Sequence, residues 1–372
     1  MVAGLRLAFI HSFLIALWAI RHIGYGGWRR VPRQIVAFGF FIPAYWLVQL
    51  FHWLGFALDE IFFRGYRQIA VRRPVFIVGV PRSGTTFLQR LLATHPDLTS
   101  MTLAESLILP SITGRYVGRT LRRLFAPIQR RLARSSWVER FQSIHRLGMS
   151  EAEEDFLALA SVGGCCVLFI LFPQTRRLWE LTALDTMVSA PLRSAYLGFY
   201  RRMVQKHMYV HGALHPRYLA KNPGFTGWMD ALRTTFPDAA FVVCTRGARQ
   251  VVPSQLSSLM PAWELVHGSR MTPSFEAGIV SMLERYYRIT ANPGPRAIVV
   301  SMTRTRSDLC AVVREIADEV RLSMAEPFVT RVRDEAGRQA AYQSRHTYDL
   351  DAFHTCWEKV SSRFSISAEA GI

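Results

Sequence analysis

Lysine and asparagine are almost missing from this chain of 372 residues. Its 45 basic residues include three lysines, Lys206, Lys221 and Lys359, and the rest are arginines. The two asparagines, Asn222 and Asn292, both precede Pro-Gly, so the chain has no Asn-x-Ser/Thr acceptor for N-glycosylation. An arginine excess with so little asparagine is typical of a GC-rich genome, and we expect a bacterial source.

The five cysteines lack the spacing of metal or disulfide frameworks. No Cys-x-x-Cys occurs, and the neighbours Cys165 and Cys166 are poorly placed to bridge to each other. This pattern argues against a zinc site and against a set of structural disulfides. It favours a reducing compartment, and we expect no metal.

Acidic residues are few, and the formal net charge is +18. Such a balance suits nucleic acid, an anionic membrane or an anionic cofactor. Residues 115–140 place many arginines around an apolar stripe, which is typical of a helix with a solvated basic face or of one lying on anionic headgroups. No aromatic stacking pattern accompanies these arginines, so nucleic acid is not an expected partner.

Long apolar runs are confined to the N-terminus. Leu7–Ile20 is interrupted only by His11 and Ser12, and Ile35–Leu58 has 24 residues without a formal charge. As a helix the second run would be about 36 Å long, enough to cross a hydrocarbon core of about 30 Å. We predict a hydrophobic membrane-associated segment at residues 1–60 and an α/β domain at 61–372. A spanning or re-entrant anchor is favoured, while a pair lying in one leaflet and a pair buried in a soluble fold remain open.

Arginines flank the second apolar run on both sides. Four lie before it, between residues 21 and 33, and four follow it, between residues 64 and 73. The positive-inside rule would put both flanks on the cytoplasmic side. We therefore expect the α/β domain on the cytoplasmic face.

Short buried strands alternate with helical patterns after residue 74. Three apolar stretches, Val75–Val78, Ala240–Thr245 and Pro295–Ser301, have the composition of buried strands, and Tyr218–Asn222 is typical of a short strand that ends at Lys221. Helical periodicity fills the sequence between them. This alternation predicts a central parallel sheet flanked by helices.

The first of these strands runs into a loop with a phosphate-binding pattern. Gly79 and Gly84 are five residues apart, and Thr85 and Thr86 open a helix. Backbone N–H groups of such a loop converge on one point, and the helix dipole favours an anion there. The loop therefore predicts a phosphate-bearing ligand, although an ordinary tight turn remains an alternative.

The cation of this loop differs from that of a nucleotide-hydrolysing phosphate loop. The pattern G-x-x-x-x-G-K-[ST] requires Lys where this chain has Thr85. Arg82, followed by Ser83, supplies the cation inside the loop, and a guanidinium can bind a doubly anionic group with two hydrogen bonds. The loop argues against ordinary ATP hydrolysis.

A second anion site is predicted at the end of the third strand. That strand delivers Arg246 to its carboxyl end, and Ser254 follows eight residues later in a helix. Carboxyl ends of parallel strands line one crevice, so Arg246 should lie beside the loop of Arg82. Two anion sites on one crevice suit a ligand with two separated phosphates.

Together these motifs resemble the sulfotransferases that use 3′-phosphoadenosine 5′-phosphosulfate (PAPS), most closely the bacterial and tyrosylprotein-type branch. The family's loop P-[KR]-S-G-T-T is similar to Pro81–Thr86, and its Arg and Ser eight residues apart are similar to Arg246 and Ser254. The resemblance extends over residues 62–353. It implies that Arg82, Ser83, Gly84, Thr85 and Thr86 hold the 5′-phosphosulfate and that Arg246 and Ser254 hold the 3′-phosphate.

The resemblance also implies two catalytic residues. Lys221 matches a family lysine that stabilises charge on the bridging oxygen, with a surface lysine as the alternative. Cytosolic members have a histidine base where this chain has Pro223. Glu105 matches the base of the tyrosylprotein branch, and a carboxylate in an apolar run is expected to have a raised pKa. A salt bridge to one of the many arginines is the other interpretation of Glu105. Ser150–Glu153 matches a capping box, so the acidic residues there are interpreted as a helix start.

The sequence thus predicts a membrane-associated, metal-independent PAPS sulfotransferase. The acceptor is a small molecule or lipid of unknown identity, with a lipid or glycolipid hydroxyl or amine favoured by the N-terminal segment. A P-loop kinase or hydrolase and a scaffold that binds anionic lipid are the alternatives. The oligomeric state is left open.

Overall fold

The computed structural model describes residues 2–120, 152, 154–268 and 270–340, together with residues 353 and 364. Its centre is a parallel sheet of five strands in the order β2-β3-β1-β4-β5. The strands are β1 (Val75–Gly79), β2 (Leu98–Thr99), β3 (Arg217–Lys221), β4 (Ala240–Thr245) and β5 (Ala297–Ser301). The predicted fold class, a parallel α/β sheet flanked by helices, is confirmed.

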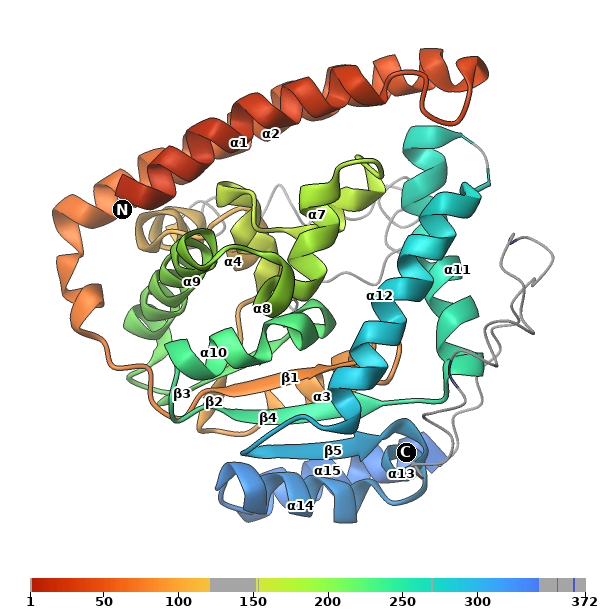
Figure 1. Ribbon diagram of the computed structural model, residues 1–372. Helices are drawn as coiled ribbons and strands as arrows, with labels where there is room; N and C mark the ends of the chain where they lie inside the picture. Colours follow the sequence, from red (N-terminus) through yellow and green to blue (C-terminus); the bar gives the residue numbers. More distant parts are fainter. Residues whose placement is uncertain are drawn as a thin grey trace, which may run out of the picture.

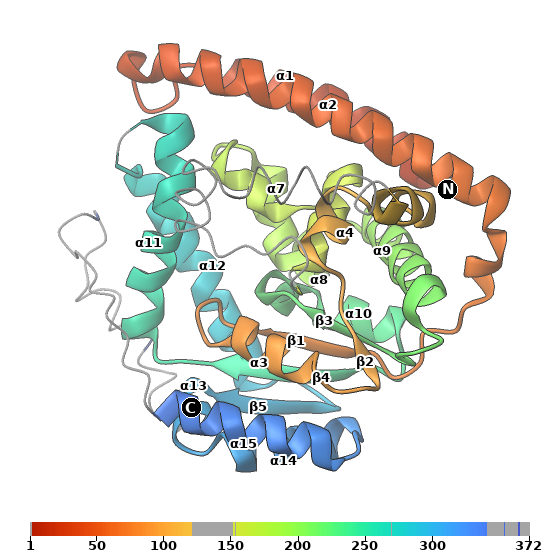
Figure 2. The same ribbon diagram turned by 180° about the vertical axis from the view of Figure 1, so that it is seen from behind.

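Helices cover both faces of the sheet (Figures 1 and 2). One face packs against α3 (Thr85–Leu92), α14 (Leu309–Val320) and α15 (Glu326–Ala340). The other face supports a larger helical layer. Its α-helices are α4 (Leu103–Leu107), α7 (Arg176–Glu180), α8 (Leu184–Met187), α9 (Ala190–His211), α10 (Met229–Thr235), α11 (Ala248–His267) and α12 (Pro273–Ala291).

Several 3₁₀ turns and one short helix complete the described elements. They are η1 (Trp28–Arg30), η2 (Arg64–Gln68), η3 (Asp155–Val162), η4 (Cys166–Ile170), η5 (Leu181–Ala183), η6 (Pro223–Trp228) and α13 (Met302–Ser307). Most were not predicted from the sequence, because single turns lack the repeat that marks a longer helix. Residues 112–120 are helical, and the rest of the basic stretch 115–140 lies outside the described residues.

Strand β1 shows why its sequence is apolar without alternation. Val75 and Ile77 contribute to the core on the α3 and α14 side, and Phe76 and Val78 to the core on the α9 and α12 side. Because both faces are covered, successive side chains are all buried. The predicted buried strand is confirmed.

The N-terminal runs form two long helices, α1 (Val2–His22) and α2 (Val31–Phe62), which pack against each other as a hairpin (Figure 1). By length and composition both could cross a membrane. Helix α2 continues through Pro43. The hairpin lies along the helical layer, on the far side from the sheet (Figures 1 and 2), and Trp18, Phe38 and Phe56 belong to the same apolar core as the α/β domain. The predicted boundary near residue 60 stays a prediction.

Candidate active site

The loop after β1 is shaped by close contact with β4. Gly79 has φ +119°, and a Cβ there would lie 2.1 Å from the carbonyl oxygen of Cys244, so only glycine fits. The side chain of Thr226 in η6 accepts a hydrogen bond from Gly79 N and donates one to Gly79 O, both at 2.8 Å. The strand end is therefore held from two sides before the chain turns.

The loop itself turns through left-handed backbone conformations. Arg82 has φ +65° and Gly84 has φ +88°, while the buried Ser83 hydroxyl donates to Val80 O at 2.5 Å. Helix α3 then begins at Thr85. This is the strand, loop and helix that the sequence predicts, and the N-terminus of α3 points its free N–H groups at the loop.

The two predicted anion sites lie together. Arg246 Nη1 donates to the carbonyl oxygen of Arg82 at 3.1 Å, and Arg82 Nε donates to Ser254 Oγ at 3.1 Å. The Tyr287 hydroxyl donates to the carbonyl oxygen of Arg246 and positions the end of β4. The expectation that Arg246 lies beside the loop is confirmed. Two guanidinium groups and one hydroxyl thus converge from the β1 loop, β4 and α11.

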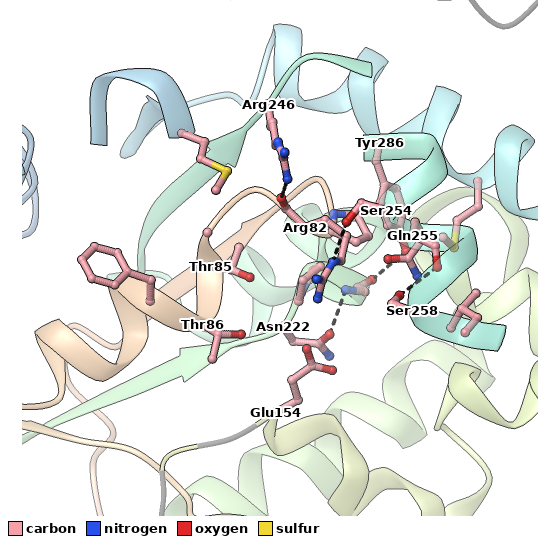
Figure 3. A pocket seen from close by; sticks show the side chains of 18 of the residues that line it. Arg82, Thr85, Thr86, Glu154, Asn222, Arg246, Ser254, Gln255, Ser258 and Tyr286 are labelled. Atoms are coloured by element: carbon pink, nitrogen blue, oxygen red, sulfur yellow. Dashed lines mark hydrogen bonds between the residues drawn. The ribbon is translucent and has the colours of Figure 1, made fainter. Parts of the chain in front are cut away.

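A cavity of about 650 Å³ opens in front of these groups. Arg82, Thr85 and Thr86 from the loop, and Arg246 and Ser254 opposite, project toward it (Figure 3). Gly84 also lines the cavity, whereas Ser83 is buried beneath the loop. Apolar side chains form part of its wall; these are Phe87, Phe156, Val167, Phe169, Leu259, Met282 and Met302. The cavity therefore combines a cationic end with an apolar wall, as small-molecule sites do.

Lys221 lies at the carboxyl end of β3 and is 1% exposed. Its Nζ donates to Glu154 Oε1 at 3.0 Å. Glu154 and Asn222, which follows Lys221 in the chain, line the cavity (Figure 3), and Lys221 itself is not among the lining residues. A surface lysine, the alternative interpretation, is therefore wrong. The site holds a lysine and a carboxylate side by side at the edge of the cavity.

Sequence reasoning missed Glu154. The acidic stretch before it was interpreted as a helix start, and Glu153 lies outside the described residues. Glu154 precedes η3, and its partner Lys221 is 67 positions away in the sequence. A carboxylate among several acids offers no local signal of such a contact, so only the folded chain distinguishes it.

Glu105 occupies a different environment and is not among the residues that line this cavity. Oε1 lies 2.8 Å from His211 Nε2 and 3.8 Å from Arg115 Nε, and Oε2 lies 3.4 Å from His207 Nδ1. Burial alone would raise the pKa of Glu105, but Arg115 and the two histidines outweigh burial and hold the pKa well below its ordinary value. The expected raised pKa is wrong, and the salt bridge to an arginine is present. Its role as a base stays a prediction.

The sequence around Glu105 contains a pattern that predicts its position at the start of a helix. Thr102-Leu-Ala-Glu105 is a Thr-x-x-Glu capping box, and both of its hydrogen bonds form at the start of α4, each at 3.2 Å. Arg115 was expected on a solvated face, but it is 2% exposed. The salt bridge to the Glu105 carboxylate compensates the charge of the buried Arg115 guanidinium. Glu105, His207 and His211 are close enough to hold a cation, but the adjacent Arg115 guanidinium disfavours one there.

Asp155, which follows Glu154 in the sequence, is a buried acid. Its Oδ2 accepts hydrogen bonds from the hydroxyls of Tyr200 and Tyr218, the latter at 2.7 Å. Burial raises the pKa of Asp155 to about 6, although the two tyrosine hydrogen bonds oppose this shift. The contacts join η3 to α9 and β3 and so fix the position from which Glu154 reaches Lys221.

The fold and the site define a class: an α/β protein with Arg82 in a strand-loop-helix suited to an anion and a second arginine, Arg246, at the end of the neighbouring strand. The profile of the Sulfotransferase family matches residues 74–326. The chain therefore belongs to the sulfotransferase family, and the resemblance found in the sequence is confirmed.

Individual relatives agree with this assignment. A putative protein-tyrosine sulfotransferase of Caenorhabditis briggsae is 24% identical over 187 residues, which cover 50% of this chain and 44% of that protein. The chain thus matches less than half the length of this curated relative. The crystal structure of sulfotransferase STF1 from Mycobacterium tuberculosis has a TM-score of 0.70 at 18% identity and covers 96% of this chain and 92% of its own. Sulfotransferase STF9 from Mycobacterium avium has a TM-score of 0.65 at 18% identity, with 85% and 80% covered. At this identity the two structures establish a shared fold.

Proposed function

We propose that this sulfotransferase transfers a sulfuryl group from PAPS to an acceptor bound in the 650 Å³ cavity. The observation that carries the proposal is the convergence of Arg82, Arg246 and Ser254 in front of the helix α3 N-terminus. Arg82, Gly84, Thr85 and Thr86, with Ser83 supporting the loop, would hold the 5′-phosphosulfate. Arg246 and Ser254 would hold the 3′-phosphate.

Sulfuryl transfer requires two further groups, a cation for the leaving oxygen and a base for the acceptor. The bridging oxygen of the donor gains charge as the S–O bond breaks, and the acceptor hydroxyl loses a proton as the new S–O bond forms. Lys221 is a cation suited to the first task, and Glu154, 3.0 Å away, is a carboxylate suited to the second. Positioning and electrostatic stabilisation supply most of the rate in such transfers.

Two carboxylates compete for the role of base. The family resemblance points to Glu105, and the cavity points to Glu154. We assign the role to Glu154 because it lines the cavity, whereas Glu105 is held by Arg115 and two histidines outside that lining. A base must reach the acceptor proton directly or through one water, so the Glu154→Gln and Glu105→Gln variants separate the two assignments.

The acceptor is proposed to be an amphipathic hydroxyl compound, with membrane lipid or glycolipid as the favoured class. The apolar wall formed by Phe156, Val167 and Phe169 supports an acceptor with an apolar part. The apolar N-terminal hairpin supports a source in the membrane. The protein-tyrosine sulfotransferase relative raises a tyrosine hydroxyl as a second candidate.

The test is transfer of radiolabelled sulfate from PAPS to a total membrane lipid extract. We expect a labelled product with the wild-type chain and at least a 100-fold loss with Arg82→Ala, by analogy with removal of one oxyanion donor. Arg249→Ala is the matched control, because Arg249 is exposed at the start of α11 and does not line the cavity. No labelled product in lipids, phenols or tyrosyl peptides, together with no binding of 3′-phosphoadenosine 5′-phosphate, would contradict the proposal.

A further inference from the structure

The N-terminal hairpin has its polar side turned inward. Gln34, Gln49, His52 and Asp59 of α2 are buried against the rest of the chain. The outward side is apolar, and its most exposed large side chains are Phe9, Phe13, Trp28, Val36, Phe40 and Phe62. A surface helix of a protein that contacts only water shows the reverse arrangement. Exposed apolar side chains along one side of a helix pair, here called the apolar band, mark an interaction surface.

Polar contacts attach α2 to the domain near both of its ends. Gln34 Nε2 lies 3.1 Å from His267 Nδ1 of α11. Asp59 accepts hydrogen bonds from the backbone of Ile112 and Thr113, and Lys206 Nζ of α9 donates to it at 2.6 Å. About 37 Å of helix separates these two points.

The middle of α2 is attached in the same way. The Tyr45 hydroxyl donates to Ala160 O at 3.1 Å, and His52 Nδ1 lies 2.9 Å from Ser161 Oγ. If α2 left the domain to cross a bilayer, these buried polar groups would lose their partners in hydrocarbon, which is costly. The helix therefore lies along the domain rather than away from it.

The charges around the apolar band have one sign. Residues 3–73 contain nine arginines and two acids, and both acids, Asp59 and Glu60, are buried. Arg21, Arg29 and Arg33, at the end of the hairpin that holds the turn, are exposed. Arginines beside an apolar face suit the anionic headgroups of a bilayer surface.

We propose that the α1–α2 hairpin docks flat on an anionic lipid bilayer, with its apolar side in the outer part of one leaflet. The turn between the helices and the α/β domain then lie on the same side of the membrane. The proposal chooses the arrangement in one leaflet over the spanning or re-entrant anchor that length and composition favour. The proposal does not depend on the donor or on the acceptor of the transfer reaction.

Cosedimentation with vesicles tests the docking. The full chain is expected to bind vesicles of phosphatidylcholine with phosphatidylglycerol, and Phe40→Glu is expected to lower the bound fraction at least tenfold. Leu214→Glu is the matched control, because Leu214 is 80% exposed and Phe40 79% exposed, but Leu214 lies outside the hairpin. Thermal unfolding checks that both variants fold.

Two outcomes of this experiment would overturn the proposal. One is equal vesicle binding by Phe40→Glu and wild type. The other is no vesicle binding at all, with a concentration-dependent dimer that Phe40→Glu abolishes, which would identify a second copy of the chain as the occupant of the apolar face.

The flat arrangement is tested by a cysteine placed in the turn. Arg29→Cys on vesicle-bound protein is treated with a membrane-impermeant maleimide added outside, and modification at this position is read by peptide mass spectrometry. Modification as rapid as in the free protein is expected. Protection that disappears only when the vesicles are permeabilised would show that the hairpin crosses the bilayer and would overturn the proposal.

Discussion

Two glutamates of this sulfotransferase have cationic neighbours but differ in what surrounds them. Glu154 lies at the edge of the 650 Å³ cavity with Lys221, and about a third of its side chain, 32%, is exposed. Glu105 is enclosed by Arg115, His207 and His211, with 13% of its side chain exposed. The same residue type therefore faces an open cavity in one place and a closed network in the other. Access to the cavity is the reason that Glu154, rather than Glu105, is proposed as the reacting carboxylate.

Glu154→Gln is the sharpest test of this comparison, with the largest expected effect. Loss of a general base typically lowers the rate about 10²- to 10⁴-fold, and we expect kcat for sulfate transfer to fall within this range. The variant should also lose thermal stability, because the buried Lys221 ammonium keeps a hydrogen-bond acceptor but loses its counter-charge, so kcat is compared per folded molecule. A rate within threefold of wild type would remove Glu154 from the mechanism.

Glu105→Gln should act on stability first. Removing one partner from a buried ion pair leaves the Arg115 charge uncompensated, which typically costs about 3–5 kcal/mol. Chemical denaturation measures this change, and sulfate transfer per folded molecule should stay close to wild type. Glu315→Gln, which breaks the exposed pair with Arg304, should leave stability nearly unchanged. A stable Glu105→Gln protein without transfer activity would restore Glu105 as the base.

The raised pKa of Asp155, the residue next to Glu154, should make the stability of the protein depend on pH. Its folded pKa of about 6 lies above 3.8, the ordinary pKa of an aspartate, so the folded state binds this proton more tightly. Its contribution to stability is therefore present below pH 3.8 and is lost as the pH rises through 6. Asp155→Asn, which does not ionise, should gain stability relative to wild type by up to about 3 kcal/mol between pH 4 and pH 7. A difference that stays constant with pH in paired urea titrations would exclude the raised pKa.

Arg246→Ala should weaken donor binding. A hydrogen bond to a charged group contributes about 1.5–3 kcal/mol, so we expect the dissociation constant for 3′-phosphoadenosine 5′-phosphate to rise roughly 10- to 150-fold. Calorimetry with adenosine 5′-phosphate, which lacks the 3′-phosphate, supplies the control, because its affinity should change much less. Equal weakening of both ligands would place Arg246 elsewhere than at the 3′-phosphate.

Ser254→Ala should have the smallest effect in this series. A neutral hydrogen bond contributes about 0.5–1.5 kcal/mol, which corresponds to a loss of donor affinity of roughly 2- to 13-fold. Ser258→Ala is the matched control, since Ser258 lines the same cavity one turn further along α11. A larger loss for Ser258→Ala than for Ser254→Ala would assign the contact with the donor to Ser258 instead.

Much of the proposed donor site was predictable, because the residues that form it lie in short stretches of sequence. The apolar run of β1, the glycine spacing and Arg82 lie within a dozen residues, and their order encodes strand, loop and helix. Arg246 could be placed beside Arg82 without contact information, because parallel strands end at one edge of the sheet. The structure agrees, with 3.1 Å between Arg246 Nη1 and the Arg82 carbonyl oxygen.

The proposed base, Glu154, was less predictable because its environment is assembled from distant segments. Glu154 meets Lys221 only when η3 and β3 pack together through Asp155 and its two tyrosines. The network of Glu105 joins α4, residues 112–120 and α9 in the same manner. The pKa of a carboxylate depends on such neighbours in space. The apolar sequence around Glu105 therefore predicted a raised pKa, whereas Arg115 and the two histidines lower it.

The sequence by itself determined the parallel α/β class, the strand-loop-helix around Arg82 and the sulfotransferase family, because each is encoded in a short, ordered pattern. It also determined that the N-terminus is long and apolar enough for a membrane. Only the tertiary structure decided which glutamate faces the cavity and which side of the hairpin faces outward. Both depend on burial, and burial is a property of packed elements rather than of any one segment.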